Sequence, residues 1–294
     1  MQKTFPDKSV FWGDLEHVFD PVRAEAIGVD MDRIIVSQPS SAEEGLESAL
    51  MLAKAGVLSL AVYDSIAAVA AMAETEASMA DSQMGVAPRL VNKFLRKWLS
   101  STSPRDGYLS PTLLCTNQKR EKIGGFRPME TTPGGRGLGF FASVELEISH
   151  GDKISLKEDD DSGEPILIGH DVNFNVIKNN TFPLGKRGKF ILCTRPYQLD
   201  REYTINAHDV DWPHSLLSYA TYYGVVEKDG NTYKYKGKKL GVGKLQAQIS
   251  VFNDASVSSL IYDEVIKASR LAHGINEEKD VEKKKKRIML RKGK

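Results

Sequence analysis

Residues 58–65, Leu-Ser-Leu-Ala-Val-Tyr-Asp-Ser, constrain the fold of this chain more than any other stretch. The run is short, mostly apolar and does not alternate, which is typical of a strand buried on both faces in a parallel sheet covered by helices. In open α/β sheets, ligands bind at the carboxyl ends of the strands, so Asp64 and Ser65 are expected to face a ligand. The alternative is that Asp64 only caps the helix expected over residues 66–73.

Strands and helices alternate along the N-terminal part of the chain. Three further stretches are predicted to be strands: residues 9–16, 32–37 and 112–118. Helices are expected from Pro21, with Asp20 as N-cap, and after Ser40 or Ser41. This order predicts the βαβ units of a mostly parallel sheet flanked by helices.

Polar side chains stand where two of these strands end. Glu16 follows the first strand, and Gln118 closes the strand at residues 112–118. A carboxylate in the position of Glu16 can act as a general base that orients a water molecule. The alternative is an exposed loop carboxylate, which is common for a single glutamate.

A basic helix is expected over residues 87–100, after a polar stretch rich in small residues. The spacing of Arg89, Lys93, Arg96 and Lys97 places their side chains on one side of that helix. Such a stripe is either a solvated face or a surface that contacts phosphates. Its position directly after a loop favours phosphate contact.

Residues 119–136 form a basic segment rich in glycine and proline, with isolated apolar residues such as Ile123 and Phe126. A long glycine-rich loop within a compact domain is usually functional or disordered. Lysine and arginine among single apolar side chains suit a segment that holds a phosphate backbone and inserts side chains between bases. The alternative is a flexible linker.

The C-terminal half has a different pattern of predicted strands and helices. Strands are expected at residues 140–148, 171–178 and 188–193, antiparallel and completing one side of the sheet, with an acidic turn at 157–164. A second, small α/β domain follows, with a helix near 215–223, a basic hairpin at 231–244 and a closing helix at 256–273. The predicted division is a core at 1–202, a small domain at 203–273 and a basic, disordered tail at 274–294.

Bulk composition limits the cellular setting. The formal net charge is +1, so any nucleic-acid surface must be local rather than global. Cys115 and Cys193 lie in apolar runs, which favours reduced core thiols in a cytoplasmic protein. No stretch approaches the roughly 18–20 apolar residues of a membrane span, and we expect no membrane partner.

Together these segments resemble the RecA family of DNA recombinases, bacterial and phage, over about residues 9–270. The segments that carry the resemblance follow in the family's order: Glu16-His17 with Asp20-Pro21, Gly28-Val-Asp with Ser37-Gln-Pro, residues 58–65, Gly85 with Arg89 and Arg96, Asn117-Gln118, Lys122-Ile-Gly, Glu130-Thr-Thr, Gly134-Gly135, Val176-Ile-Lys178-Asn179 and residues 235–244. Each is weak alone, but their order is specific. The resemblance implies a RecA-like ATPase core.

The resemblance implies a role for each strand-end residue. Glu16 would polarise the attacking water, and Asp64 would support Mg²⁺ through its water shell. Gln118 would sense the γ-phosphate, and Lys178 would act on the ATP of a neighbouring subunit. Asp20 and Ser65 would contact the cofactor.

The resemblance also implies DNA and self partners. A helical filament of copies would hold single-stranded DNA, pair it with double-stranded DNA and exchange strands in recombination, repair and the SOS response. The residues assigned to DNA are Met84, Gly85, Arg89, Arg96, Lys119, Arg120, Lys122, Ile123, Phe126, Arg127, Gly134, Gly135 and Arg136. The setting would be the cytoplasm of a bacterium or a phage-infected host.

One family motif is missing. The phosphate-binding loop Gly-x-x-x-x-Gly-Lys-[Ser/Thr] does not occur anywhere in the sequence. Arg23 stands where an adenine-stacking aromatic is expected, and Asn180 replaces a second trans-acting lysine. We therefore expect negligible ATPase from this polypeptide alone, and a separate segment that carries the loop. The alternatives are a DNA-binding or filament-modulating fragment that does not hydrolyse ATP, and a helicase-loader or circadian-clock relative, which the paired loops disfavour.

Overall fold

The computed structural model describes residues 1–76, 85–102, 110–122, 129–133, 135, 137–159, 165–180, 186–200 and 203–273. The chain divides into two compact units, Met1–Ala142 and Ser143–Lys294. The domain boundary predicted after residue 202 stays a prediction. Within the described ranges, no helix has both the length and the apolar character needed to cross a bilayer.

The first unit is built on a parallel sheet, as predicted. Its four strands, in the order β2-β1-β3-β4, are β1 (Ser9–Asp14), β2 (Ile34–Ser37), β3 (Leu58–Asp64) and β4 (Thr112–Cys115). β3 lies between β1 and β4, and Ala61, Val62 and Tyr63 in it are at most 3% exposed. The reading of residues 58–64 as a strand buried on both faces is confirmed.

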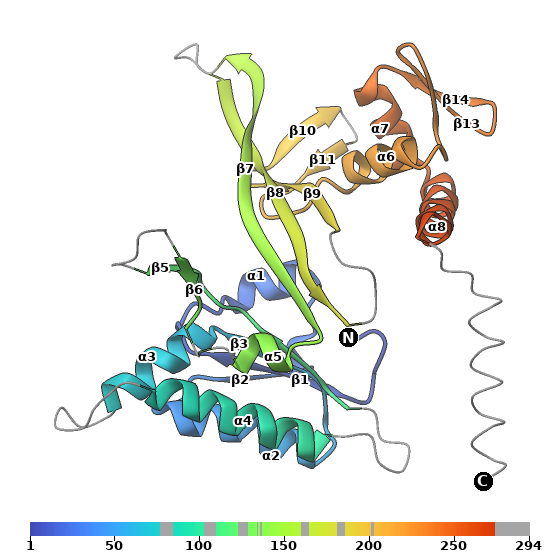
Figure 1. Cartoon of the computed structure of the whole chain (residues 1–294). Helices are drawn as coiled ribbons and strands as arrows, with labels where there is room; N and C mark the ends of the chain where they lie inside the picture. Colours follow the sequence, from blue (N-terminus) through green and yellow to red (C-terminus); the bar gives the residue numbers. More distant parts are fainter. Residues whose placement is uncertain are drawn as a thin grey trace, which may run out of the picture. The chain divides into compact units, whose positions relative to one another are not determined.

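Three helices cover one face of this sheet (Figure 1): α2 (Ala42–Lys54), α3 (Ile66–Glu76) and α4 (Val86–Thr102). Helix α2 begins where Ser41 Oγ accepts a hydrogen bond from the backbone N–H of Glu44, at 3.1 Å. Its buried residues are spaced by three and four positions, which places them on the face that meets the sheet: Leu46, Ala49, Leu50 and Ala53.

Tyr63 joins the sheet to two of these helices. Its hydroxyl donates to the backbone carbonyl of Gly45 in α2 at 2.8 Å, and its ring meets Phe94 of α4 edge-on, with centroids 5.4 Å apart. The ring lies against Gly13 on the neighbouring strand, where a Cβ would stand 2.8 Å from a ring carbon. A glycine at position 13 therefore leaves room for the ring of the buried tyrosine.

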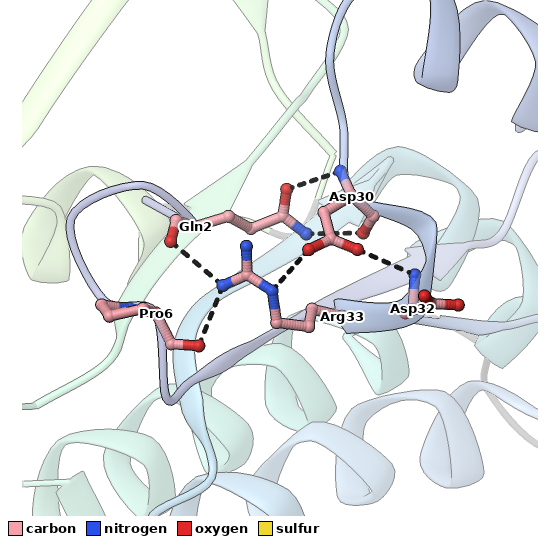
Figure 2. Close-up of polar contacts among 5 residues, drawn as sticks. All are labelled: Gln2, Pro6, Asp30, Asp32 and Arg33. Atoms are coloured by element: carbon pink, nitrogen blue, oxygen red, sulfur yellow. Dashed lines mark hydrogen bonds and ion pairs between the residues drawn. The ribbon is translucent and has the colours of Figure 1, made fainter.

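A polar cluster holds the segment before β1 (Figure 2). The Arg33 guanidinium, in the short 3-10 helix η1 (Met31–Arg33), donates to Asp30 Oδ2 at 2.6 Å and to the carbonyls of Gln2 and Pro6 at 3.1 and 3.0 Å. The Gln2 amide both donates to the Asp30 carbonyl and accepts from its N–H. These contacts attach the N-terminal residues to the turn that leads into β2.

Four shorter elements complete the first unit: α1 (Pro21–Ala26), β5 (Arg120–Lys122), β6 (Met129–Thr131) and α5 (Gly137–Phe141). Strands β5 and β6 pair antiparallel, so the segment expected to be a loop contains a two-stranded ribbon, too short to show a pattern. The strand predicted from residue 140 was wrong at its start. Leu138 and Phe141 are three positions apart and both pack on the core, which a helix allows.

The second unit contains an antiparallel sheet of β7 (Val144–Asp159), β8 (Pro165–Asn179) and β9 (Arg187–Cys193). Figure 1 shows β7 and β8 as a pair of long strands. The antiparallel pairing is confirmed, but these strands form a sheet of their own rather than completing the four-stranded one. β7 also continues into the predicted acidic turn. Its register shifts between His150 and Lys153, a bulge that breaks the alternation seen in the sequence.

The rest of the second unit is a short strand pair and a small α/β assembly. The pair consists of β10 (Tyr197–Asp200) and β11 (Tyr203–Ile205). The assembly has its own buried core and contains α6 (Trp212–Tyr222), β12 (Glu227–Asp229), β13 (Thr232–Tyr235), β14 (Lys238–Val242), α7 (Lys244–Asn253) and α8 (Ala255–Ala272). The predicted hairpin and closing helix are present. Helix α7 was missed because Gly243, its N-cap, offers no side chain as a start signal.

Candidate functional site

Three of the predicted site residues, Glu16, Ser65 and Gln118, lie together at the carboxyl ends of three neighbouring strands. Glu16 follows β1, Ser65 follows β3, and Gln118 lies three residues after β4. Glu16 Oε1 accepts hydrogen bonds from Ser65 Oγ at 2.5 Å and from Gln118 Nε2 at 3.5 Å. The parallel order β1-β3-β4 brings these ends to the same edge of the sheet. The catalytic and cofactor roles of these residues stay predictions.

Asp64 is held by a residue that the sequence analysis did not assign. Thr116 Oγ1 donates to Asp64 Oδ1 at 2.7 Å. The cap of helix α3 is Ser65, whose Oγ accepts from the backbone N–H of Ala68 at 3.2 Å. Ser65, rather than Asp64, therefore caps helix α3. The carboxylate of Asp64 instead accepts a hydrogen bond from Thr116, just after the neighbouring strand β4.

A buried carboxylate shapes the loop that carries Glu16. Asp14 is fully buried and accepts from the N–H groups of Val18 and Phe19 at 3.0 and 3.2 Å and from Gln38 Nε2 at 2.8 Å. Burial alone would raise the pKa of Asp14, but these three hydrogen bonds outweigh it, so the pKa lies below its usual value. The loop that carries Glu16 is thus folded around the ionised side chain of Asp14. The sequence analysis had not predicted this role for Asp14.

The described side chains fit only part of a magnesium–nucleotide site. Asp64, Ser65 and Glu16 supply oxygen atoms of the kind that hard cations and water molecules require. No group of three or more His, Cys, Asp or Glu side chains in the described part of the chain is arranged to hold a metal ion directly. The sequence contains no phosphate-binding loop, so these side chains match only the acidic residues expected of such a site.

Two other predicted site residues lie elsewhere. Asp20 is the N-cap of α1, accepting from the N–H of Arg23 at 3.0 Å, and its contact with a cofactor stays a prediction. Lys178 lies in β8, opposite Glu145, and therefore belongs to the second unit. Its action on a neighbouring subunit also stays a prediction.

The basic stripe on α4 divides into two kinds of residue. Lys93 and Lys97 form ion pairs with two glutamates of α2, Glu43 at 3.2 Å and Glu47 at 3.0 Å. Arg89 and Arg96, which the resemblance assigned to DNA, are exposed on the same helix. The two arginines are therefore better placed than the two lysines to meet an anionic ligand.

The end of the second predicted DNA segment packs beside the start of α4. Asn117 Nδ2 donates to the carbonyl of Pro133 at 3.1 Å. Gly135 has a φ of +75°, and a Cβ there would lie 3.1 Å from Cβ of Pro88, which precedes Arg89. These contacts bring the two predicted DNA-binding segments together in the first unit.

Other predicted DNA contacts can be placed only in part. Lys119 is exposed, and Arg120 and Lys122 belong to β5 by their backbone. Six lie outside the described residues: Met84, Ile123, Phe126, Arg127, Gly134 and Arg136. The resemblance had given no functional role to Asp14, Gln38 or Thr116. For Thr116, the only signal in the sequence was its place beside Asn117 at the end of a predicted strand.

Comparisons with known proteins show the family to which the sequence is similar. The family model described as the RecA N-terminal domain matches residues 2–193. The chain is 34% identical over 274 residues to Protein RecA of Lactobacillus delbrueckii subsp. bulgaricus, covering 92% of this chain and 68% of the relative. It is 38% identical over 232 residues to Protein RecA of Francisella philomiragia subsp. philomiragia and of Francisella tularensis subsp. novicida, covering 79% of this chain and 58% of each relative.

Proposed function

Because this chain belongs to the RecA family, we propose that it acts in DNA recombination and repair. In this proposal, copies of the chain assemble on single-stranded DNA as a filament, pair it with a duplex and exchange strands. The relatives are named Protein RecA, and the chain spans 58% to 68% of their length in these matches. The proposed setting is the cytoplasm of a bacterium or of a phage-infected host, where the protein would act in the SOS response.

The observation that carries this proposal is the exposed surface of α4 that Arg89 and Arg96 share. Exposed Arg89 and Arg96 lie on the helix whose first turn contacts Gly135, at the end of the second predicted DNA segment. Guanidinium groups bind phosphate oxygens in a bidentate manner. A glycine in the left-handed region allows a backbone to approach a neighbour closely. The side chains proposed to extend the surface along that segment are Lys119, Arg120, Lys122 and Arg127.

The strand-end cluster supports a nucleotide-linked role. ATP with magnesium, when bound, would supply phosphoryl transfer. Glu16 Oε1 is engaged by Ser65 and Gln118, which leaves Glu16 Oε2 to accept a hydrogen bond from a water molecule and orient it. Gln118 links that carboxylate to the segment that follows it. Lys178 would serve a neighbouring copy, and Asp20 and Ser65 would face the nucleotide.

A second candidate function is favoured by the missing phosphate loop. Without its backbone N–H groups and lysine, a triphosphate loses most of its contacts. The chain would then bind DNA and modulate a filament without hydrolysing ATP. Alternatively, a separate segment that carries the loop would complete the site.

The salt dependence of single-stranded DNA binding tests the proposed surface. For single strands, each phosphate contact contributes about 0.7 to the slope of log K against log salt concentration. Replacing Arg89 and Arg96 with Gln should therefore reduce the slope by about 1.4.

The matched control replaces Lys93 and Lys97 with Gln, which removes the same charge from the same helix. Because those lysines are paired with Glu43 and Glu47, the control should change the slope less. Equal slopes for the two double variants would refute the proposed DNA surface.

A further inference from the structure

Thr116 contacts Asp64, the carboxylate that the family resemblance assigns to the magnesium of the proposed nucleotide site. Its Oγ1 lies 2.7 Å from Asp64 Oδ1 and 3.3 Å from the carbonyl oxygen of Tyr63. A threonine hydroxyl has one proton, and its hydrogen bond to an ionised acceptor is the shorter and stronger one. The proton is therefore directed at Asp64.

The backbone around Thr116 makes this contact rigid. The N–H of Thr116 donates to the carbonyl of Tyr63, and its own carbonyl accepts from the N–H of Ile66, each at 3.0 Å. On the other side, the N–H of Leu15 donates to the carbonyl of Asp64 at 2.9 Å. Residues before, at and after Asp64 are thus bonded to the two flanking strand ends, and Thr116 cannot move away independently.

We propose that Thr116 is a positioning residue that fixes the side-chain rotamer of Asp64. Oδ1 is tied to Thr116, which leaves Oδ2 to accept hydrogen bonds from the water shell of a divalent cation. The part that concerns the cation rests on the proposed function, whereas the fixed rotamer does not.

Each of the two carboxylates of the site is then held by a different hydroxyl group. Ser65 engages Glu16, and Thr116 engages Asp64. The partly exposed Asp64 side chain would otherwise exchange among its staggered rotamers. Holding a reacting group in one orientation before its ligand arrives is the usual contribution of such supporting contacts.

Two substitutions separate this role from a purely structural one. Thr116→Val keeps the β-branched shape that suits a strand end and removes the hydroxyl. Thr116→Ser keeps the hydroxyl and removes the methyl group. A packing role predicts that the valine variant resembles the wild type, and a positioning role predicts that the serine variant does.

The test measures the χ1 angle of Asp64 in the full chain by three-bond couplings, after selective isotopic labelling of aspartate. We expect one rotamer in the wild type and in Thr116→Ser, and averaged couplings in Thr116→Val. Averaged couplings in the wild type, or a single rotamer in a folded Thr116→Val, would overturn the proposal. The measurement needs no nucleotide or DNA, so its failure is distinct from failure of the proposed DNA surface.

Discussion

Asp14 is the residue on which the geometry of the Glu16 loop depends. Replacing it with Asn leaves three donors facing a group that can accept fewer of them, in a buried position. We expect Asp14→Asn to lower the free energy of unfolding by about 1–3 kcal/mol, measured by urea denaturation at pH 7. The exposed Asp7→Asn serves as the control and should change the stability little.

The same residue predicts a pH dependence. The pKa of Asp14 is lowered in the fold, so its contribution is present above the unfolded-state pKa of about 3.9. That contribution is lost as the pH falls through the lower folded-state value. The stability difference between wild type and Asp14→Asn should therefore shrink below about pH 4. A difference that stays constant down to pH 2 would contradict the assignment of an ionised Asp14.

His214 adds a second titration, near the start of α6. Its Nε2 lies 2.9 Å from Nζ of Lys244. Burial first, and then the charge of Lys244, lower the pKa of His214 below its usual value, although Asp211 acts in the opposite direction. The fold therefore favours the neutral imidazole. The contribution of neutral His214 to stability is fully present above about pH 6.5, the usual pKa of histidine in an unfolded chain. It is lost as the pH falls from there through the lower pKa of His214 in the folded state.

The corresponding variant is His214→Gln, which cannot titrate. Between pH 7 and pH 5 the wild type should lose stability relative to this variant, as followed by thermal unfolding at each pH. Parallel pH profiles for the two proteins would show that His214 is protonated equally in the folded and unfolded states.

At the scale of elements, the N-terminal segment depends on Arg33. Its guanidinium bridges Asp30 and two backbone carbonyls of residues 2 and 6 (Figure 2). We expect Arg33→Ala to release residues 1–8, with faster amide exchange there and a loss of about 1–2 kcal/mol of stability. Lys3→Ala, a charge removal in the same segment, is the control. Unchanged exchange in Arg33→Ala would mean that other contacts hold the segment.

The elements differ in how well the sequence predicted them. β3 and α2 were predictable because burial on both faces and a three-to-four spacing leave direct patterns in the residues. β7 was cut short because a bulge after His150 breaks its alternation, and α7 was missed because Gly243 is no conventional cap. In the site, Glu16 and Gln118 could be placed from the strand order. The Asp64–Thr116 contact depends on side-chain rotamers, which spacing does not encode.

For the molecule as a whole, we expect a division between two activities: the polypeptide should bind DNA without hydrolysing ATP. The sheet edge carries Glu16, Asp64 and Gln118, and the sequence contains no phosphate-binding loop. DNA binding and nucleotide turnover should therefore be separable in this polypeptide. It should bind single-stranded DNA through the Arg89 and Arg96 surface while the strand-end cluster remains catalytically idle.

The most direct test of this division is the rate of ATP hydrolysis by the purified chain, with and without saturating single-stranded DNA. A Glu16→Gln variant measured in parallel defines the background from contaminating enzymes. We expect the same background rate for both proteins in both conditions, with DNA binding intact. DNA-stimulated turnover well above that of Glu16→Gln would contradict it, because the chain would then hold a triphosphate without the loop.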